Sequence, residues 1–324
     1  MKQMLKIEIE RAFEGTAFKV ALAIGCLISL VQFFNVGVRH AINPLEFYWY
    51  NWLHFPYTVI DTWLGANTDV YYEVFNRVVP LLVAIPYAAS YYTDKRSGII
   101  NNYYVRTKRI NYLVAKLAAV FLTGGAIVVF PLFINFVSTS AIVPTFLWKT
   151  SSFEIGAGAM WSSIFYKNMY VYYLLYFILE FVCAGLLATI SLVVSLWMNN
   201  TFVVLLFPTI LCEFMNVAST WSSINAIHGL APRRLFNMAQ LTPNYWQSYV
   251  IFIVVIVVFD VVIYLCATGN GIYFSQNWSP TLERASISSQ IVERPVIHGR
   301  NAGGIRRRIS ISVFSDGYHN RLNY

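Results

Sequence analysis

The chain has 324 residues, of which 57% are hydrophobic and only 12% are charged. Soluble globular proteins average roughly 45–50% apolar and about 25% charged residues, so this charge content is too small to cover a soluble fold. Intrinsic disorder is excluded as well, because disordered chains combine low hydrophobicity with high charge. The composition therefore indicates an integral membrane protein. It gives no support to a nucleic-acid partner, since no soluble segment carries a basic face interleaved with aromatic residues.

Hydrophobic segments recur along the chain, and six of them are long enough to cross about 30 Å of hydrocarbon at ~1.5 Å per residue. The six predicted spans are residues 17–38, 74–92, 112–137, 169–198, 201–219 and 246–268. Only Asn199 and Asn200 separate the fourth span from the fifth, so a tight hairpin is expected there. These segments predict an all-α, polytopic fold with six transmembrane helices.

The basic residues are distributed unequally between the two faces that these spans define. One face, which includes both termini, carries 17 of the 23 Lys and Arg residues, and the other face carries the remaining 6. Because basic residues favour cytoplasmic loops, both termini are expected to be cytoplasmic and the chain is expected in the cell membrane.

The N-terminal segment is amphipathic. Residues 1–16 alternate charged side chains such as Lys6, Glu8 and Arg11 with apolar ones. This pattern differs from a cleavable signal peptide and favours a helix that lies on the membrane surface before the first span.

The composition changes after Gly269. The following segment is rich in Ser, Arg and Gly and has little helical periodicity. We therefore expect a transmembrane domain over residues 1–270 and a weakly ordered cytoplasmic tail over residues 271–324.

Several catalytic motifs are missing from the sequence. It contains no Gly-x-x-x-x-Gly-Lys-Ser/Thr phosphate loop, no His-Glu-x-x-His metal motif and no Gly-x-Ser-x-Gly nucleophile elbow. The four cysteines and five histidines are scattered and lack the spacing of metal ligands. The prediction is a protein that is not an enzyme, with no catalytic residue, cofactor or metal in this chain.

The second inner loop is the most informative stretch. Gly98 can end the helix of the second span, and Ile99, Ile100, Tyr103 and Tyr104 then recur at helical spacing. They predict a short amphipathic helix that lies across the cytoplasmic face. Composition alone also allows a simpler interpretation, in which this is a basic loop that fixes the topology and touches anionic lipid.

The loop and the predicted topology resemble the type-2 export permeases of ABC transporters. The resembling residues run from Pro80-Leu-Leu-Val-Ala-Ile-Pro-Tyr-Ala-Ala-Ser90 through Asp94-Lys-Arg-Ser-Gly98 to Arg109-Ile-Asn-Tyr-Leu-Val-Ala-Lys116. The resemblance covers roughly the first 140 residues, and by topology it extends to about residue 268. In that family this loop contains a coupling helix that docks on a separate ATPase subunit.

The resemblance implies a function and a set of partners. The chain would be the transmembrane subunit of an ATP-driven exporter that moves an amphipathic or hydrophobic substrate, such as a peptide, drug or lipid, by alternating access. Two ATPase subunits would bind the ATP and Mg, and a second permease, identical or homologous, would complete the assembly within the lipid. The implied ATPase contact consists of Asp94, Lys95, Arg96, Ile99, Ile100, Tyr103 and Tyr104. The alternative is a six-span scaffold or sensor that transports nothing.

Six residues within the spans are candidates for the translocation path: Glu180, Glu213, Asp260, Pro80, Pro86 and Pro208. An ionisable group within a span is costly and should face the bundle interior or a wet cavity. For Glu180 and Asp260 the alternative is a structural hydrogen bond between helices. The resemblance favours Glu213, because in that family the second and fifth spans line the exit path. The prolines can open a cavity or simply kink the helices.

Overall fold

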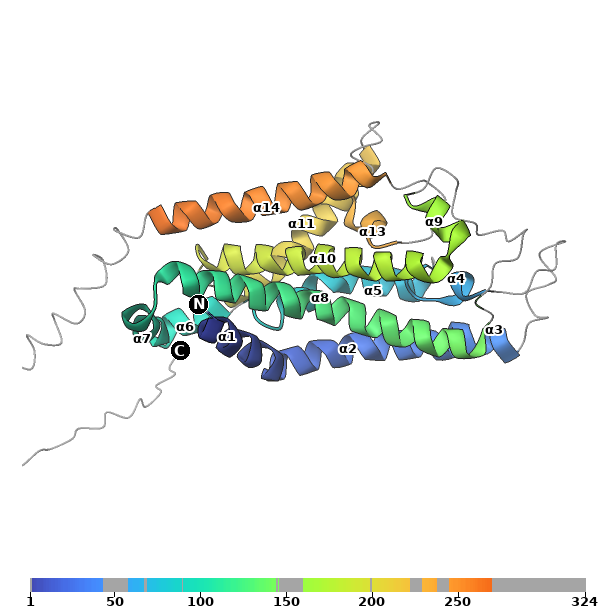
Figure 1. The fold of residues 1–324 in the computed structure, drawn as a ribbon, viewed down its shortest axis with the longest axis horizontal. Helices are drawn as coiled ribbons and strands as arrows, with labels where there is room; N and C mark the ends of the chain where they lie inside the picture. The colour runs from blue at the N-terminus through green and yellow to red at the C-terminus, as the bar shows by residue number, and fades with distance from the viewer. Residues whose placement is uncertain are drawn as a thin grey trace, which may run out of the picture. The chain divides into compact units, whose positions relative to one another are not determined.

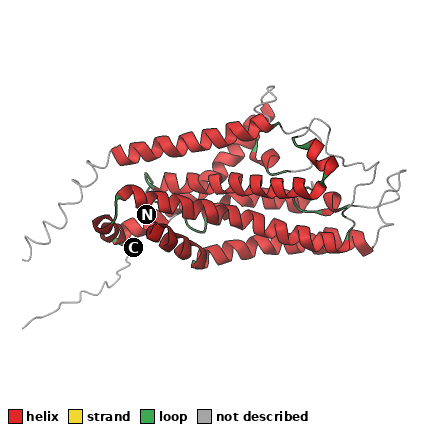
Figure 2. Ribbon diagram, viewed as in Figure 1, coloured by secondary structure: helices red, strands yellow, loops and turns green. Residues whose placement is uncertain are grey.

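The regular elements that the structure describes are all helices (Figures 1 and 2). The computed structural model describes residues 2–42, 58–66, 69–88, 90–143, 145, 160–198, 200–221, 229–237 and 245–269. The tail predicted over residues 271–324 lies outside the described residues, and so do residues 43–57 and 67–68 between the first two predicted spans.

Five of the described helical segments are long and apolar enough to cross a membrane. They are α2 (Thr16–Gln32) with its continuation through the π-helical turn η1 (Phe33–Val38) and α3 (Arg39–Ile42), α8 (Arg109–Ile142), α10 (Met169–Ser195), α11 (Thr201–Trp221) and α14 (Trp246–Gly269). They coincide with five of the six predicted spans, and the expected break between the fourth and fifth lies between Ser195 and Thr201. The chain is therefore a helical protein with the properties of a membrane protein.

The second predicted span, residues 74–92, is not one continuous helix. Helix α5 (Val70–Ala84) has 15 residues, about 22 Å at ~1.5 Å each, which is shorter than the hydrocarbon layer. It is followed by a non-helical turn and then by α6 (Ser90–Arg96). Pro86 lies in the turn, where its ring removes a backbone donor and disfavours continued helix. The part of the chain that the structure describes therefore has five long helices and one broken segment where six transmembrane helices are predicted.

Helix α5 is nevertheless central to the fold. It contacts α2, α8, α10 and α11, and its buried side chains include Phe75, Val79 and Val83. A segment surrounded by four helices does not need to match the lipid thickness by itself, because its backbone is buried in protein where helix breaks are tolerated. The broken segment therefore forms part of the core.

The N-terminal helix α1 (Lys2–Glu14) is present as predicted. Its buried residues Met4, Glu8 and Ala12 recur every four positions, so they form one stripe that packs against α8. In Figure 1, α1, α6 and α7 (Ile99–Arg106) all lie at one end of the described helices, on the left of the view.

At the other end, polar side chains fix the segment that precedes α5. Helix α4 (Val59–Thr62) begins with a capping box, in which Thr58 and Asp61 bond each other's backbone amides. The indole of Trp63 donates to the carbonyl of Leu132 on α8 at 3.0 Å, and the amide oxygen of Asn135 accepts from the backbone of Leu64 at 3.1 Å. These bonds hold the 58–66 segment against α8.

Two further short helices lie in later connections: α9 (Ser162–Lys167) between α8 and α10, and α13 (Pro232–Leu235) between α11 and α14.

Helices α8 and α10 make the closest pair in the core. A Cβ atom added to Gly124 would lie 2.4 Å from the Cβ atom of Ala188, and one added to Gly185 would lie 2.7 Å from the backbone oxygen of Phe121. Small residues of this kind allow two membrane helices to approach closely and gain van der Waals contact. The α8–α10 pair is therefore the tightly packed centre on which α2, α5, α11 and α14 are arranged.

Candidate functional site

A cluster of four charged side chains lies at the end of the fold where α1, α6 and α8 meet. We call Glu8, Arg11, Asp94 and Lys116 the ion cluster. The guanidinium of Arg11 donates to both carboxylate oxygens of Asp94, at 3.0 and 2.6 Å. The ammonium nitrogen of Lys116 lies 2.7 Å from Asp94 and 3.3 Å from Glu8. The cluster therefore joins one cation and one anion from the N-terminal segment to one of each from α6 and α8.

Hydroxyl groups and aromatic rings complete the surroundings of the ion cluster. The phenol of Tyr87 donates to Glu8 at 2.5 Å, and the phenol of Tyr112 donates to Asp94 at 2.7 Å. Lys116 also donates to the hydroxyl of Ser90 at 3.1 Å. Its ammonium nitrogen lies 4.7 Å from the ring centre of Tyr87 and 5.2 Å from that of Tyr112. Lys116 is thus held by carboxylates, a hydroxyl and two ring faces, which compensate its burial.

The charges of the ion cluster balance. Glu8, Asp94 and Lys116 are fully buried, while Arg11 is half-buried. Burial alone raises the pKa of Asp94, but the hydrogen bond from Arg11 and the charge of Lys116 outweigh it, so the pKa of this carboxyl group lies below its ordinary value. The hydrogen bond to Asp94 raises the pKa of Arg11. Two cations and two anions therefore lie together, with no net formal charge. Among the described residues, no group of His, Cys, Asp and Glu side chains is arranged to hold a metal ion.

Helix α7 follows α6 and precedes α8 along the chain, and the ion cluster joins α6 to α8. It begins after Gly98, whose φ of 73° is in the left-handed region that glycine adopts most easily, and it ends two residues before Lys108 caps α8. Tyr103 stacks on Tyr112 with ring centres 5.3 Å apart, and Tyr104 contacts the same ring edge-on. These contacts fasten α7 to the first turn of α8, next to the ion cluster.

The residues expected to contact an ATPase fall into two groups. Ile100 is only 7% exposed, and Tyr103 and Tyr104 are partly buried against α8, so these three attach α7 to the fold. Arg96 and Ile99 are exposed, and Lys95 is partly exposed. Val105, which the sequence did not single out, is 88% exposed and adds an apolar side chain to the outer surface of α7.

Asp94 lies in a different place from the one expected. The resemblance implies that Asp94 is part of the ATPase contact, but its side chain is fully buried and its carboxylate is held by Arg11, Tyr112 and Lys116 of the same chain. Its structural effect is therefore to fix α6 to α1 and α8, and the carboxylate is not presented at the surface.

The candidate translocation residues do not share one site. Pro80 lies inside α5 and Pro208 inside α11, both buried, while Pro86 marks the break after α5. Glu213 is exposed on α11, beside Phe214, which is also exposed. Helices α5 and α11 contact each other, so the second and fifth predicted segments are neighbours.

The two remaining carboxylates have different surroundings. Asp260 on α14 accepts a hydrogen bond from Thr189 on α10 at 2.6 Å, which is the structural bond between helices that was the alternative for this residue. Glu180 on α10 is 2% exposed, and among the described residues neither of its carboxyl oxygens has a hydrogen-bond partner. A hydrogen bond between helices is thus present at Asp260, and none is present at Glu180 among the described residues.

The sequence did not identify the ion cluster as a site, although it contained two signals for it. Glu8 interrupts the apolar stripe of Met4 and Ala12, which is an unusual position for a carboxylate unless it has a buried partner. Tyr112 and Lys116 lie four residues apart and therefore on the same face of one helix. Neither signal names the partner, because Arg11 and Asp94 are 83 positions apart.

Comparisons of the chain with protein-family models, with curated proteins and with solved structures give no match. The functional interpretation therefore rests on the sequence pattern and on the geometry described above.

Proposed function

We propose that the chain is the transmembrane subunit of an ATP-driven exporter of the type-2 ABC permease kind, working with a separate ATPase. The observation that carries the proposal is the attachment of α7. This exposed helix is linked by two-residue connectors to α6 and α8, and the ion cluster locks those two helices to each other and to α1.

This arrangement suits the transmission of force. A push on the outer surface of α7, at Ile99 and Val105, would move α6 and α8 together, because Asp94 and Lys116 are bonded in the buried interior. Helix α8 continues through the core against α10, and α6 continues through the break at Pro86 into α5. A small displacement at the surface would thus reach two central segments, as rigid-body transitions require.

The exposed face of α11 supports a second permease subunit. A carboxylate that faces lipid is costly, and Glu213 lies beside large exposed side chains such as Phe214. A facing subunit, identical or homologous, would remove Glu213 from lipid and place α5 and α11 at the subunit interface. In this proposal the substrate path runs along that interface and carries an amphipathic or hydrophobic substrate such as a peptide, drug or lipid.

The proposal includes an orientation. The end formed by α1, α6 and α7 is placed at the cytoplasm, with the broken α5–α6 segment counted as the sixth crossing, so that both termini are cytoplasmic. The excess of Lys and Arg on this side supports it. Two ATPase subunits with bound ATP and Mg would meet the chain there, in the cell membrane.

The test uses the surface of α7. The tagged full chain is purified from the membranes of its own host, and bound ATPase activity and the presence of a subunit with a phosphate loop are measured. The changes Ile99→Asp and Val105→Asp place charge on the exposed apolar positions and should abolish copurifying ATPase activity. Asn102→Asp adds the same charge at an exposed polar position of α7 and should retain it.

Ile100 is unsuitable for this test, because it is buried and its replacement by Asp would disturb the fold. Thermal unfolding of each variant verifies that the chain is intact. If the intact wild-type chain brings down no ATPase, or if Ile99→Asp and Val105→Asp leave the activity unchanged, the exporter proposal is wrong and the scaffold or sensor alternative takes its place.

A further inference from the structure

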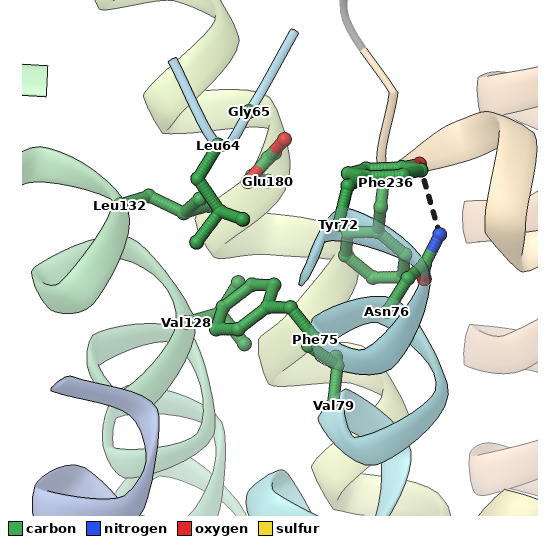
Figure 3. Close-up of a pocket in the computed structure, with 10 residues that line it drawn as sticks. All are labelled: Leu64, Gly65, Tyr72, Phe75, Asn76, Val79, Val128, Leu132, Glu180 and Phe236. Carbon is green, nitrogen blue, oxygen red and sulfur yellow. Dashed lines mark hydrogen bonds between the residues drawn. The ribbon is translucent and has the colours of Figure 1, made fainter. Parts of the chain in front are cut away.

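A small pocket lies in the core between α5, α8 and α10, with the 58–66 segment and the 229–237 segment as its other walls (Figure 3). The centre of a water molecule has about 10 Å³ of room in it, which is enough for about one water. The lining residues are mostly apolar or aromatic: Leu64, Gly65, Tyr72, Phe75, Asn76, Val79, Val128, Leu132, Glu180 and Phe236. The pocket is therefore too small for an organic ligand and matches a ligand of the size of water.

Glu180 is the only carboxylic acid among the residues that line the pocket. Its side chain is 2% exposed, and among the described residues neither carboxyl oxygen has a hydrogen-bond partner. Figure 3 shows the carboxyl group among side chains contributed by α5, α8 and the 58–66 segment. A buried carboxylate ion without donors loses far more solvation free energy than a neutral carboxyl group does. The burial therefore favours the protonated group, which needs an acceptor for its hydrogen.

The surroundings of Glu180 offer no compensation for a negative charge. The residues that line the pocket include no Lys, Arg or His. The titratable side chains that act on Glu180 or respond to it are Tyr72 on α5 and Tyr176 and Cys183 on α10. The two phenols donate to backbone carbonyls of the 229–237 segment, at 2.8 and 2.6 Å. These hydroxyl groups are therefore already used, and neither donates to Glu180.

Helix α5 supplies an acceptor in the wall of the same pocket. Pro80 lies inside α5 and has no amide hydrogen, so it cannot donate to the backbone carbonyl of Asn76, four residues earlier. Asn76 lines the pocket, and its side-chain amide donates to the Tyr72 oxygen at 2.9 Å, drawn as the dashed line in Figure 3. A backbone carbonyl that lacks its helical donor accepts from another group or from a buried water. Pro80 thus provides an acceptor for a donor inside the pocket.

We propose that the pocket binds one proton and one water molecule. Glu180 holds the proton and donates it in a hydrogen bond to the water, and the water donates to the Asn76 carbonyl that lacks a donor at Pro80. The water then has two polar partners, as buried waters require. This link joins α10 to α5 at the turn where Pro80 interrupts the helical hydrogen bonds. The proposal goes beyond the exporter function and does not depend on it, because the site belongs to this chain alone and needs no ATPase.

The test is infrared spectroscopy of the purified full chain at neutral pH, in a maltoside detergent that has no carbonyl group of its own. The wild type should show the C=O stretch of a protonated carboxyl group, and Glu180→Gln should lose it. Asp260→Asn changes a carboxyl group outside the pocket and should keep this band. Because Gln has the size and neutrality of protonated Glu, the unfolding temperature of Glu180→Gln should stay close to that of the wild type.

Pro80→Ala tests the acceptor. The restored amide can donate to the Asn76 carbonyl and compete with the water, so the Glu180 C=O stretch should move to higher frequency as its hydrogen bond weakens. Pro208→Ala makes the same change inside α11, outside the pocket, and should leave the band in place. Exchange into heavy-oxygen water should shift an O–H stretch in the wild type and not in Glu180→Gln.

Three results would overturn the proposal. Absence of the Glu180 band at neutral pH would show that the carboxyl group is ionised. An unmoved band in Pro80→Ala would show that the Asn76 carbonyl is not the acceptor. Absence of a vibration that responds to heavy oxygen would show that no water completes the link.

Discussion

The ammonium nitrogen of Lys116 lies 2.7 Å from a carboxylate oxygen of Asp94, and both side chains are fully buried. This contact joins α8 to α6 beside the exposed helix α7, and Glu8 and Arg11 extend it to α1. A buried pair of this kind is expensive to break, since removing one partner leaves the other charge buried and uncompensated. The ion cluster therefore connects α1, α6 and α8 at the end of the fold where we propose that the ATPase binds.

Lys116→Met should destabilise the chain by about 3–5 kcal/mol, because two buried carboxylates then face only the Arg11 charge. The double variant Glu8→Gln with Lys116→Met should recover part of that loss, since one of the two anions is removed. Thermal unfolding in nanodiscs measures both effects. Equal stability of wild type and Lys116→Met would contradict the ion cluster.

The stability that Asp94 provides should depend on pH. Its pKa is lower in the folded chain than its ordinary value of about 3.9, so its contribution is fully present above that value and is lost as pH falls through the lowered pKa. The difference in unfolding temperature between wild type and Asp94→Asn should therefore be largest near neutral pH and should shrink below about pH 4. A difference that grows on acidification would have the opposite sign and refute the pairing.

Gly185→Ala should weaken the α8–α10 contact. The added Cβ atom would lie 2.7 Å from the backbone oxygen of Phe121, which cannot turn aside as a side chain can, so the two helices must separate. Overpacking of this kind costs about 1–3 kcal/mol. Gly15→Ala is the matched control, because its nearest contact would be 3.4 Å away. Unfolding temperatures of the two variants should differ clearly.

Thr189→Val should destabilise the α10–α14 contact by about 1–3 kcal/mol. Valine has nearly the same shape as threonine but no hydroxyl group, so Asp260 loses its hydrogen-bond donor while the packing is kept. Thr189→Ser keeps the hydroxyl group and should retain most of the stability. An equal loss in both variants would show that the methyl group, and not the hydrogen bond to Asp260, holds the two helices.

Local features of the fold could be predicted from the sequence, and long-range pairings could not. Hydrophobic length identified α8, α10, α11 and α14 as helices, and Gly98 correctly separated α6 from α7. The second span was predicted as continuous because its apolar run is continuous, whereas burial by neighbouring helices and the ring of Pro86 allow it to break.

The same distinction applies to the sites. The sequence around Asp94 is charged and gives no sign that this residue is buried. Its burial depends on helices α1 and α8, whose Arg11 and Lys116 contact its carboxylate. Glu180 and Asp260 look alike in the sequence, since each is a lone carboxylate in an apolar helix. They differ in their hydrogen bonds: the hydroxyl group of Thr189 donates to Asp260, whereas no described residue donates to Glu180.

The most direct test of the exporter proposal is a cross-link from α7. A photoreactive amino acid replaces Val105, which is 88% exposed, and in a second variant replaces Val70, which is 73% exposed and begins α5. Irradiation of host membranes should join position 105 to a polypeptide with a phosphate loop, and the yield should change when ATP is added, while position 70 gives no such product. Cross-links from position 105 to lipid alone, with no ATP-binding polypeptide, would contradict the proposal.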